Sequence, residues 1–232
     1  MTQYCFTPPP IPAVPIRGSK QMYPIRRIFC VGRNYEAHAR EMGTTVDHEA
    51  PFYFCKTPSA YVPSGATVPY PPGTSNNHYE MELVVALGAP AFRVVAEVAL
   101  AAVLGYACGL DMTRRDLQNA AKDKARPWDL GKDYENSAVL SEIVPVSQCS
   151  HVRRGAIELR LNGALKQSSD VCLMIHPVAA IIADLSKYYH LQAGDLIYTG
   201  TPQGVGPVKP GDKLAGSVEG VGTIELTMGP AE

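Results

Sequence analysis

The sequence has no apolar run that approaches the roughly 20 residues needed to cross a bilayer, so no membrane-spanning helix is expected. It also has little excess charge, because 21 lysines and arginines face 22 aspartates and glutamates, for a formal net charge of −1. No basic patch stands out along the chain, which argues against a nucleic-acid-binding protein. The N-terminus shows no basic-then-apolar signal pattern, so we expect a cytoplasmic protein.

Several motifs of common protein classes are missing as well. The six cysteines never form a C-x-x-C pair, which argues against a zinc knuckle. We expect free buried thiols rather than disulfides, as is usual in a reducing compartment. No G-x-S-x-G elbow is present, which argues against a serine hydrolase. The glycine- and proline-rich stretch 198–207 lacks the spacing of either common phosphate-binding loop.

What remains is the composition of an ordinary globular protein. Hydrophobic residues make up 46% and charged residues 19% of the 232 positions, which is enough for one substantial core. Residues 1–25 contain six prolines, which disfavour regular structure. We therefore expect an extended N-terminal segment over 1–25 and a single catalytic domain over 26–232.

Short apolar segments alternate with turn-forming stretches, without a regular strand–helix–strand repeat. This pattern predicts an α+β fold, namely a mixed β-rich roll or sandwich with a few short helices. Asn162-Gly163, between two alternating stretches, predicts a type I′ hairpin over 157–166. Further strands are expected at 27–31, 51–56, 79–87 and 105–110, with strands and turns in the C-terminal third.

Four short helices are also predicted from their end signals. The first covers 35–42, with Asn34 as N-cap and Gly43 just beyond its end. The second is an apolar helix over 95–104. The third covers 113–125, with Thr113 and Asp116 as a capping-box-like pair. The fourth has Pro177 as its first helical residue.

Glu80-Met81-Glu82 is the sharpest local feature. On a strand, residues two apart point to the same face, so these two carboxylates would project side by side. They repel each other unless a positive charge lies between them, and carboxylate oxygens suit Mg²⁺, Mn²⁺ or Ca²⁺. Asp111 follows an apolar strand and would supply a third carboxylate. The alternatives are an exposed strand end for the glutamates and a loop or capping role for Asp111.

A second candidate pair lies on the first predicted helix. His38 and Glu41 are three residues apart, so their side chains can meet on one face. A carboxylate beside an imidazole stabilises the imidazolium, which is how proteins build a general base that activates water. The alternative is a surface pair without a function.

The charge of such a metal site requires further cations. A divalent ion with three carboxylates is net negative, so an anionic substrate needs additional positive charge. Arg115 and Lys132 would supply it, and arginine suits bidentate contact with a carboxylate. Each of the two is equally well explained as a solvated surface charge.

Six motifs, in this order, resemble the fumarylacetoacetate hydrolase family from about Ile28 to Met228. Matches in the same order are far more specific than any one of them. The motifs are VGRNYEAHAREMG (31–43), FYFCKTPSA (52–60), NHYEMELVVALG (77–88), GYACGLDMTRRDLQ (105–118), RPWDLGKDYE (126–135) and YTGTPQGVGP (198–207).

This resemblance implies a fold, a cofactor and a set of roles. It implies the β-rich roll of the family's C-terminal domain, usually a homodimer, and Mg²⁺ or Mn²⁺ on Glu80, Glu82 and Asp111. It also implies a water-activating pair on a lid and an active-site cation at Lys132. The positions that match those near the bound keto acid are Arg115, Asp116, Gln118 and Thr201.

The resemblance also implies a reaction. No fourth acidic ligand is evident upstream of the glutamate pair, which is typical of the shorter acylpyruvase branch. The N-terminal third looks most like the bacterial members that cleave fumarylpyruvate in gentisate-type aromatic breakdown. We therefore expect metal-dependent hydrolysis of a C–C bond in a 2,4-diketo acid. The alternatives are a decarboxylase or tautomerase of an oxaloacetate-like acid, and a binding protein without turnover. A second substrate carboxylate would need a cation, for which Lys122, Lys124 and Arg126 are candidates.

Overall fold

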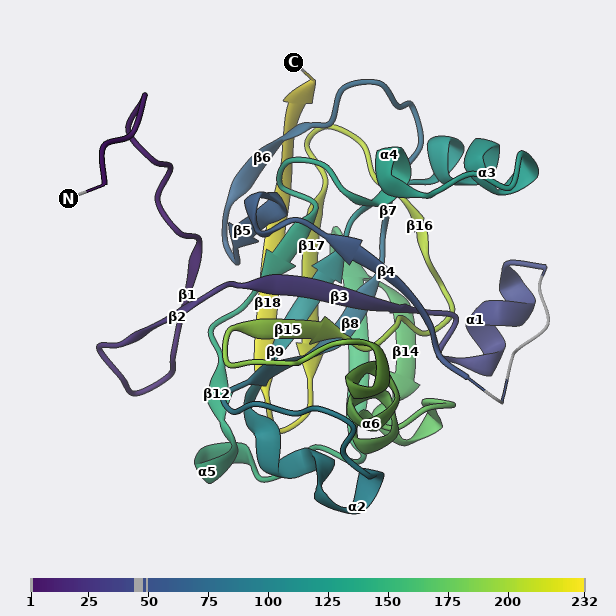
Figure 1. The fold of residues 1–232 in the computed structure, drawn as a ribbon. Helices are drawn as coiled ribbons and strands as arrows, with labels where there is room; N and C mark the ends of the chain where they lie inside the picture. Colours follow the sequence, from purple (N-terminus) through teal and green to yellow (C-terminus); the bar gives the residue numbers. More distant parts are fainter. Residues whose placement is uncertain (1, 44–47, 49, 232) are drawn as a thin grey trace.

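The computed structural model describes residues 2–43, 48 and 50–231, and it shows two packed β-sheets with short helices around them (Figure 1). This confirms the predicted α+β fold. The larger sheet has eight strands in the order β4-β3-β15-β8-β9-β11-β5, with β12 paired to β9. Its strands are β3 (Arg27–Gly32), β4 (Phe52–Lys56), β5 (Tyr61–Pro63), β8 (Met81–Leu87), β9 (Val103–Asp111), β11 (Ala138–Leu140), β12 (Val144–Pro145) and β15 (Asp195–Tyr198).

The second sheet has five strands in the order β14-β13-β17-β18-β6. Its strands are β6 (Thr67–Tyr70), β13 (Ala156–Leu161), β14 (Ala164–Asp170), β17 (Lys213–Val218) and β18 (Gly222–Ala231). Two small sheets complete the fold: β1 (Ala13–Pro15) with β2 (Met22–Pro24), and β7 (Asn77–Tyr79) between β10 (Thr113–Arg114) and β16 (Gly206–Pro207).

The alternating side chains of β8 divide the interior into two cores. Met81, Leu83 and Val85 belong to the large core, together with side chains of β13, β17 and β18 from the second sheet. Val84 and Ala86 belong to a smaller core on the other face of the same strand. Both faces of β8 are therefore buried, and the face that carries Glu82 is shielded from water.

The larger sheet is strongly curved because its two edge strands are close in sequence. Only residues 57–60 connect β4 at one edge to β5 at the other, with a 3₁₀ turn at Pro58–Ala60. The small core therefore lies inside this curve, and it is built partly from the small residues Ala86, Ala107 and Ala138. One end of this enclosed space is where the carboxylates predicted above gather.

The helices of the described residues are short and lie at the periphery of the sheets (Figure 1). Their bounds are α1 (Glu36–Glu41), α2 (Ala96–Ala99), α3 (Arg115–Asp123), α4 (Asp129–Lys132), α5 (Val146–Cys149) and α6 (Val178–Tyr188). None of the helices in the part of the chain described here is long and apolar enough to cross a membrane.

Most predicted elements are present, and the hairpin is confirmed: β13 and β14 pair, and Asn162 and Gly163 both have positive φ, at 51° and 83°. The predicted apolar helix over 95–104 was wrong in extent. Residues 96–99 form α2, residues 100–102 form a 3₁₀ turn, and the chain then enters β9 at Val103. Pairing with β8 over seven positions extends this strand beyond its predicted start.

Three predicted helix starts also need correction. The N-cap of α1 is Tyr35, whereas Asn34 bonds to the backbone of His176 and Thr199. Thr113 does not cap a helix, because it pairs with β7 and its hydroxyl donates to the carbonyl of Asp111. Pro177 is the N-cap of α6 rather than its first helical residue.

The six cysteines are all free, as predicted. Only Cys30 and Cys108 are buried, so the expectation of buried thiols was wrong for Cys5, Cys55 and Cys172, which are exposed.

Candidate active site

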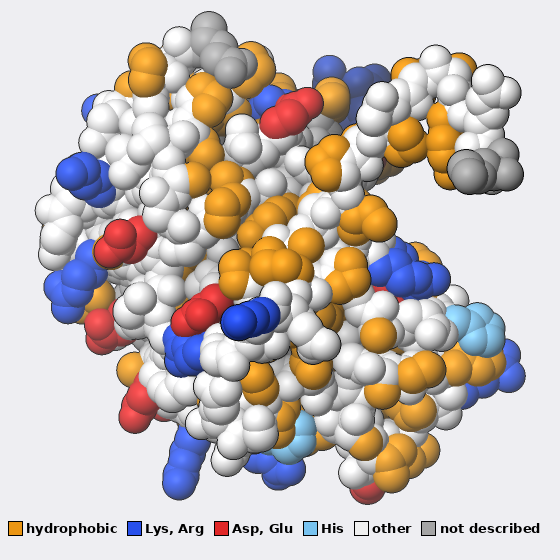
Figure 2. All heavy atoms as spheres, turned by 90° about the vertical axis from the view of Figure 1, so that its left-hand side faces the viewer, with side chains coloured by type: hydrophobic (Ala, Val, Ile, Leu, Met, Phe, Trp, Pro, Cys, Tyr) orange, Lys and Arg blue, Asp and Glu red, His pale blue; other side chains and the backbone are white. Residues whose placement is uncertain are grey.

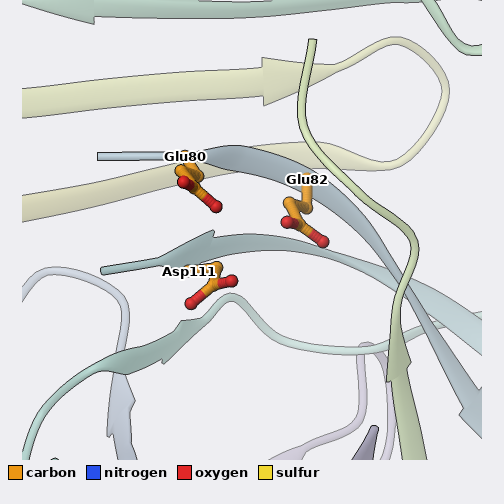
Figure 3. Close-up of side chains that lie close together, drawn as sticks. All are labelled: Glu80, Glu82 and Asp111. Carbon is orange, nitrogen blue, oxygen red and sulfur yellow. The ribbon is translucent and has the colours of Figure 1, made fainter. Parts of the chain in front are cut away.

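Glu80, Glu82 and Asp111 meet at one end of the larger sheet, as Figure 3 shows. Each offers one oxygen, and these three oxygens lie within 4.8 Å of one another. All three residues are buried, with at most 5% of their surface exposed. The alternatives of an exposed strand end and a capping aspartate are therefore wrong.

Strand pairing explains why these acids meet. The amide of Asp111 donates to the carbonyl of Glu80 at 2.9 Å, so the two residues lie opposite each other on neighbouring strands. Glu82 lies opposite Gly109, and a Cβ added there would lie 2.5 Å from Val84 and 2.6 Å from Tyr198. The position opposite Glu82 must therefore be glycine, because Val84 and Tyr198 occupy the space that a Cβ would need.

Each carboxylate has different partners. Glu80 accepts from the guanidinium of Arg115 and, at 2.7 Å, from the ammonium of Lys132. Asp111 accepts from the same ammonium at 2.7 Å. Glu82 accepts from the amide of Gly200 at 2.7 Å, and no ion pair reaches it from the described residues.

The pKa values follow these partners. Burial raises the pKa of Glu80, but the charges of Lys132 and Arg115 outweigh it, so the pKa lies well below its usual range. For Glu82, burial and the neighbouring charges of Asp111 and Glu80 raise the pKa well above that range. A carboxylate in this position is stabilised by a cation placed between the three acids.

These residues fit a divalent ion. Three buried carboxylates are the oxygen donors that Mg²⁺ and Mn²⁺ prefer. Oδ1 of Asp111 is buried and has no hydrogen-bond donor in good geometry among the described residues, although the Lys56 ammonium lies 2.9 Å away. Glu82 lacks a compensating positive charge, as shown above. The triad can therefore hold a divalent metal ion.

Lys56 lies at the carboxylate cluster, although the sequence analysis did not single it out. Its ammonium lies 2.9 Å from Asp111 and donates to Ser137 at 3.0 Å, to the carbonyl of Met112 at 3.2 Å and to that of Lys132. The sequence signal was a lysine that directly continues an apolar strand. If such a lysine is buried, it needs a negatively charged partner. The Lys56 ammonium therefore forms an ion pair with Oδ1 of Asp111, the oxygen that Lys132 does not contact.

Lys132 lies on α4, between two of the acids. Its ammonium donates at 2.7 Å to Glu80, to Asp111 and to the hydroxyl of Thr113. A Cβ added at Gly131 would lie 2.8 Å from the backbone nitrogen of Gln118, so the close contact between α4 and α3 requires glycine there. This contact brings Lys132 to the carboxylates.

His38 and Glu41 form the predicted pair on α1. Nδ1 of His38 lies 3.3 Å from Glu41, which also accepts from the amide of Gly204 at 3.1 Å. His38 is buried in the cleft, and burial lowers its pKa in spite of the negative charge of Glu80. The imidazole is therefore neutral near pH 7 and able to accept a proton.

One cleft joins the two groups. It is lined by His38, two of the acids, Lys132 and three of the four predicted substrate-binding residues: Arg115, Gln118 and Thr201. The fourth, Asp116, is not among the lining residues. Its carboxylate accepts instead from Thr74 at 2.6 Å and from the amide of Ser75, so it holds that loop.

The sequence is similar to enzymes of known activity. It is 62% identical to a fumarylpyruvate hydrolase of Ralstonia over 193 residues, which cover 82% of this chain and all of the relative. It is 41% identical to the mitochondrial oxaloacetate tautomerase FAHD1 of Bos taurus, with 88% of this chain and 91% of the relative covered.

The structure is similar to a crystal structure of fumarylpyruvate hydrolase from Pseudomonas aeruginosa in complex with Mn²⁺ and pyruvate. The two share 44% identity and a TM-score of 0.95, over 99% of this chain and all of the other. The sequence model of the fumarylacetoacetate (FAA) hydrolase C-terminal family matches residues 27–228. The chain therefore belongs to the fumarylacetoacetate hydrolase family.

Proposed function

We propose that this protein hydrolyses fumarylpyruvate to fumarate and pyruvate, with Mg²⁺ or Mn²⁺ held by Glu80, Glu82 and Asp111. The observation that carries the proposal is that one cleft is lined both by two acids of the three-carboxylate cluster and by a neutral, buried histidine paired with a glutamate. The similar fumarylpyruvate hydrolases support the choice of substrate. The compound belongs to gentisate-type aromatic breakdown, which we propose as the setting.

The reaction needs a base, and His38 is placed to supply it. Its imidazole takes a proton from water, whose oxygen attacks the acyl carbonyl of the substrate, and Glu41 stabilises the imidazolium. The C–C bond then breaks, its electron pair passes to the pyruvate enolate, and a proton returns to that carbon. A bound divalent ion supplies electrostatic stabilisation of the developing enolate charge.

The charges of the site fit an anionic keto acid. Three carboxylates face three buried cations, Lys56, Lys132 and Arg115, so the protein side chains are close to neutral as a group. A divalent ion then makes the cleft positive. This favours a substrate that carries two carboxylates, as fumarylpyruvate does.

The test is turnover by the purified protein with Mn²⁺ on fumarylpyruvate, acetylpyruvate and oxaloacetate, with pyruvate as the readout. We expect pyruvate from the two acylpyruvates, and a His38→Ala variant that is slower by about 10²–10⁴-fold. Calorimetry should show unchanged Mn²⁺ binding in that variant. Full activity of His38→Ala with metal bound would refute the assignment of the base, and no turnover of any acylpyruvate would refute the function.

A second candidate is tautomerisation of an oxaloacetate-like acid. The observation in its favour is the similarity to oxaloacetate tautomerases. Stabilisation of an enolate would serve tautomerisation, decarboxylation and C–C hydrolysis alike. Only the hydrolysis also needs His38 and Glu41 to activate a water molecule. Keto–enol interconversion of oxaloacetate that outpaces fumarylpyruvate cleavage would favour this candidate.

We further propose that the active form is a cytoplasmic homodimer, with residues 26–232 as the catalytic domain. Free thiols fit a reducing compartment. The N-terminal arm (residues 2–12) stands off the body, and hydrophobic side chains gather along it and on the face beside it in Figure 2. Phe6 and Ile11 on this arm are each 72% exposed, which favours contact with a second subunit. Light scattering of the protein with and without residues 2–12 tests this proposal.

A further inference from the structure

The outer part of the cleft combines two positive charges with aromatic rings. Arg33 follows β3, and Lys122 lies near the end of α3, and both line the cleft. The rings come from β4 and from the turn before α4. Phe52 and Trp128 have centroids 4.9 Å apart in an edge-to-face arrangement, and Phe54 lies 6.0 Å from Trp128.

These two cations differ from those at the inner end. Arg115 and Lys132 are bonded to Glu80. In contrast, no carboxylate of the described residues lies within ion-pair distance of Arg33 or Lys122. Their positive charges therefore remain available to a ligand.

Aromatic faces hold both cations in place instead. The Lys122 ammonium lies 5.1 Å from the Trp128 ring, and the Arg33 guanidinium lies 6.0 Å from the Phe52 ring. Burial lowers the pKa of Lys122 to about 8, with help from the charges of Arg115 and Arg33, while that of Glu80 acts the other way. The region is thus positive and would be stabilised by an anion.

The backbone at Arg33 is unusual and firmly held. Its φ of 58° is in the left-handed region, which a non-glycine residue rarely adopts. The next residue, Asn34, bonds through its side chain to the carbonyls of His176 and Thr199 and to the amide of His176. These bonds fix the turn that carries Arg33, and such local strain is typical of ligand sites.

The spacing along α3 fits a long substrate. Arg115, Gln118 and Lys122 all line the cleft, and their spacing puts them on one helix face. Lys122 is seven positions after Arg115, which corresponds to a rise of about 10 Å along the helix. The extended carbon chain of fumarylpyruvate spans roughly 7 Å. The long, flexible side chain of Lys122 can cover the remaining distance of about 3 Å, so a ligand of this length can extend from the carboxylate cluster to this cation.

We propose that Arg33 and Lys122 form a second anion subsite, which binds the far carboxylate of a dicarboxylic acylpyruvate. This inference rests on the proposed function. The subsite sets the acyl-group specificity: a fumaryl group places its carboxylate between the two cations, whereas an acetyl group does not reach them. Of the three cations considered from the sequence, only Lys122 lines the cleft, and Lys124 and Arg126 do not.

The kinetic test compares two substrates in three variants. Lys122→Met removes one cation, Arg33→Asn removes the other with a residue that tolerates the left-handed backbone, and Lys124→Met is the matched control. In the first two variants we expect kcat/KM for fumarylpyruvate to fall at least tenfold more than kcat/KM for acetylpyruvate. The loss should come mainly from a higher KM for fumarylpyruvate. Lys122→Arg, which keeps the charge, should retain most of the kcat/KM for fumarylpyruvate. In Lys124→Met, the ratio of kcat/KM for fumarylpyruvate to kcat/KM for acetylpyruvate should be unchanged. Equal losses on both substrates, or no loss, would overturn the proposal.

A binding test separates this proposal from the proposed function, because it needs no turnover. Trp128 is the only tryptophan of the chain, so its fluorescence reports on this wall of the cleft. With Mn²⁺ present, fumarate should bind saturably. Crotonate has a methyl group in place of one carboxylate, and it should bind at least tenfold more weakly than fumarate. Lys122→Met should remove this difference. Equal affinities for fumarate and crotonate in the unmodified protein would overturn the subsite even if the protein hydrolyses acylpyruvates.

Discussion

Replacement of Lys56 by methionine tests whether a buried cation holds the carboxylate cluster together. Methionine keeps the length of the aliphatic stem but removes the ammonium that lies 2.9 Å from Asp111. The Asp111 carboxylate then keeps only Lys132 as its positively charged partner, and Ser137 and the Met112 carbonyl each lose a hydrogen-bond donor. The surrounding space is fully buried, so water cannot replace these contacts.

The expected cost is large. Removal of one partner from a buried ion pair typically costs about 3–5 kcal/mol. In a chain of this size each kcal/mol lowers Tm by about 2–4 °C, so the midpoint of thermal unfolding should fall by about 6–20 °C. The measurement is thermal unfolding of the unmodified protein and Lys56→Met by circular dichroism, in the presence of a chelator so that both are free of metal.

Lys187→Met is the matched control, because Lys187 also pairs with an aspartate, Asp184, at 2.8 Å, but on the surface. Solvent screens this pair, so Tm should change little. The reasoning about Lys56 would be refuted if the two variants unfolded at the same temperature. It would also fail if Lys56→Met lost activity with no change in Tm, since that would place Lys56 in the chemistry rather than behind Asp111.

Three further predictions concern the chemistry. Glu41→Gln keeps an acceptor for the backbone but cannot stabilise charged His38, so kcat should fall about 10²-fold; an unchanged kcat would contradict this pairing. Glu82→Gln should weaken Mn²⁺ binding at least tenfold by calorimetry, whereas Asp116→Asn should not; equal effects would argue against the triad. Lys122 loses its charge as the pH rises through about 8, so kcat/KM for fumarylpyruvate should fall there relative to acetylpyruvate, and a constant ratio would argue against the outer subsite.

The local patterns that the sequence predicted well depend on short-range geometry. Alternation along a strand put Glu80 and Glu82 on one side, and the spacing of three on a helix brought His38 to Glu41. A two-residue type I′ turn needs positive φ at both central positions, and Asn and Gly are the residues that tolerate it best. Such rules involve neighbours in sequence, so they hold before any tertiary contact is known.

Predictions of element ends were less accurate, because tertiary contacts override local propensity. Asn34 has the side chain of a good N-cap, but it bonds to residues more than 140 positions away instead. Thr113 has the side chain of a helix N-cap, but it lies in β10 and pairs with His78 of β7. In both cases a long-range hydrogen bond replaces the local one that the pattern predicted.

The sequence by itself therefore determined the family, the α+β fold and the three carboxylates with their histidine, because ordered motifs and strand or helix periods carry that information. The sequence also singled out Arg115 and Lys132, but only the tertiary structure showed which other charged residues lie near the carboxylates. It buried Lys56 beside Asp111, directed the Asp116 carboxylate to Thr74, and placed Lys122, but not Lys124 or Arg126, in the lining of the cleft. The physical reason is that the energy of a charge depends on its burial and on partners brought from distant segments, and neither is visible from spacing along the chain.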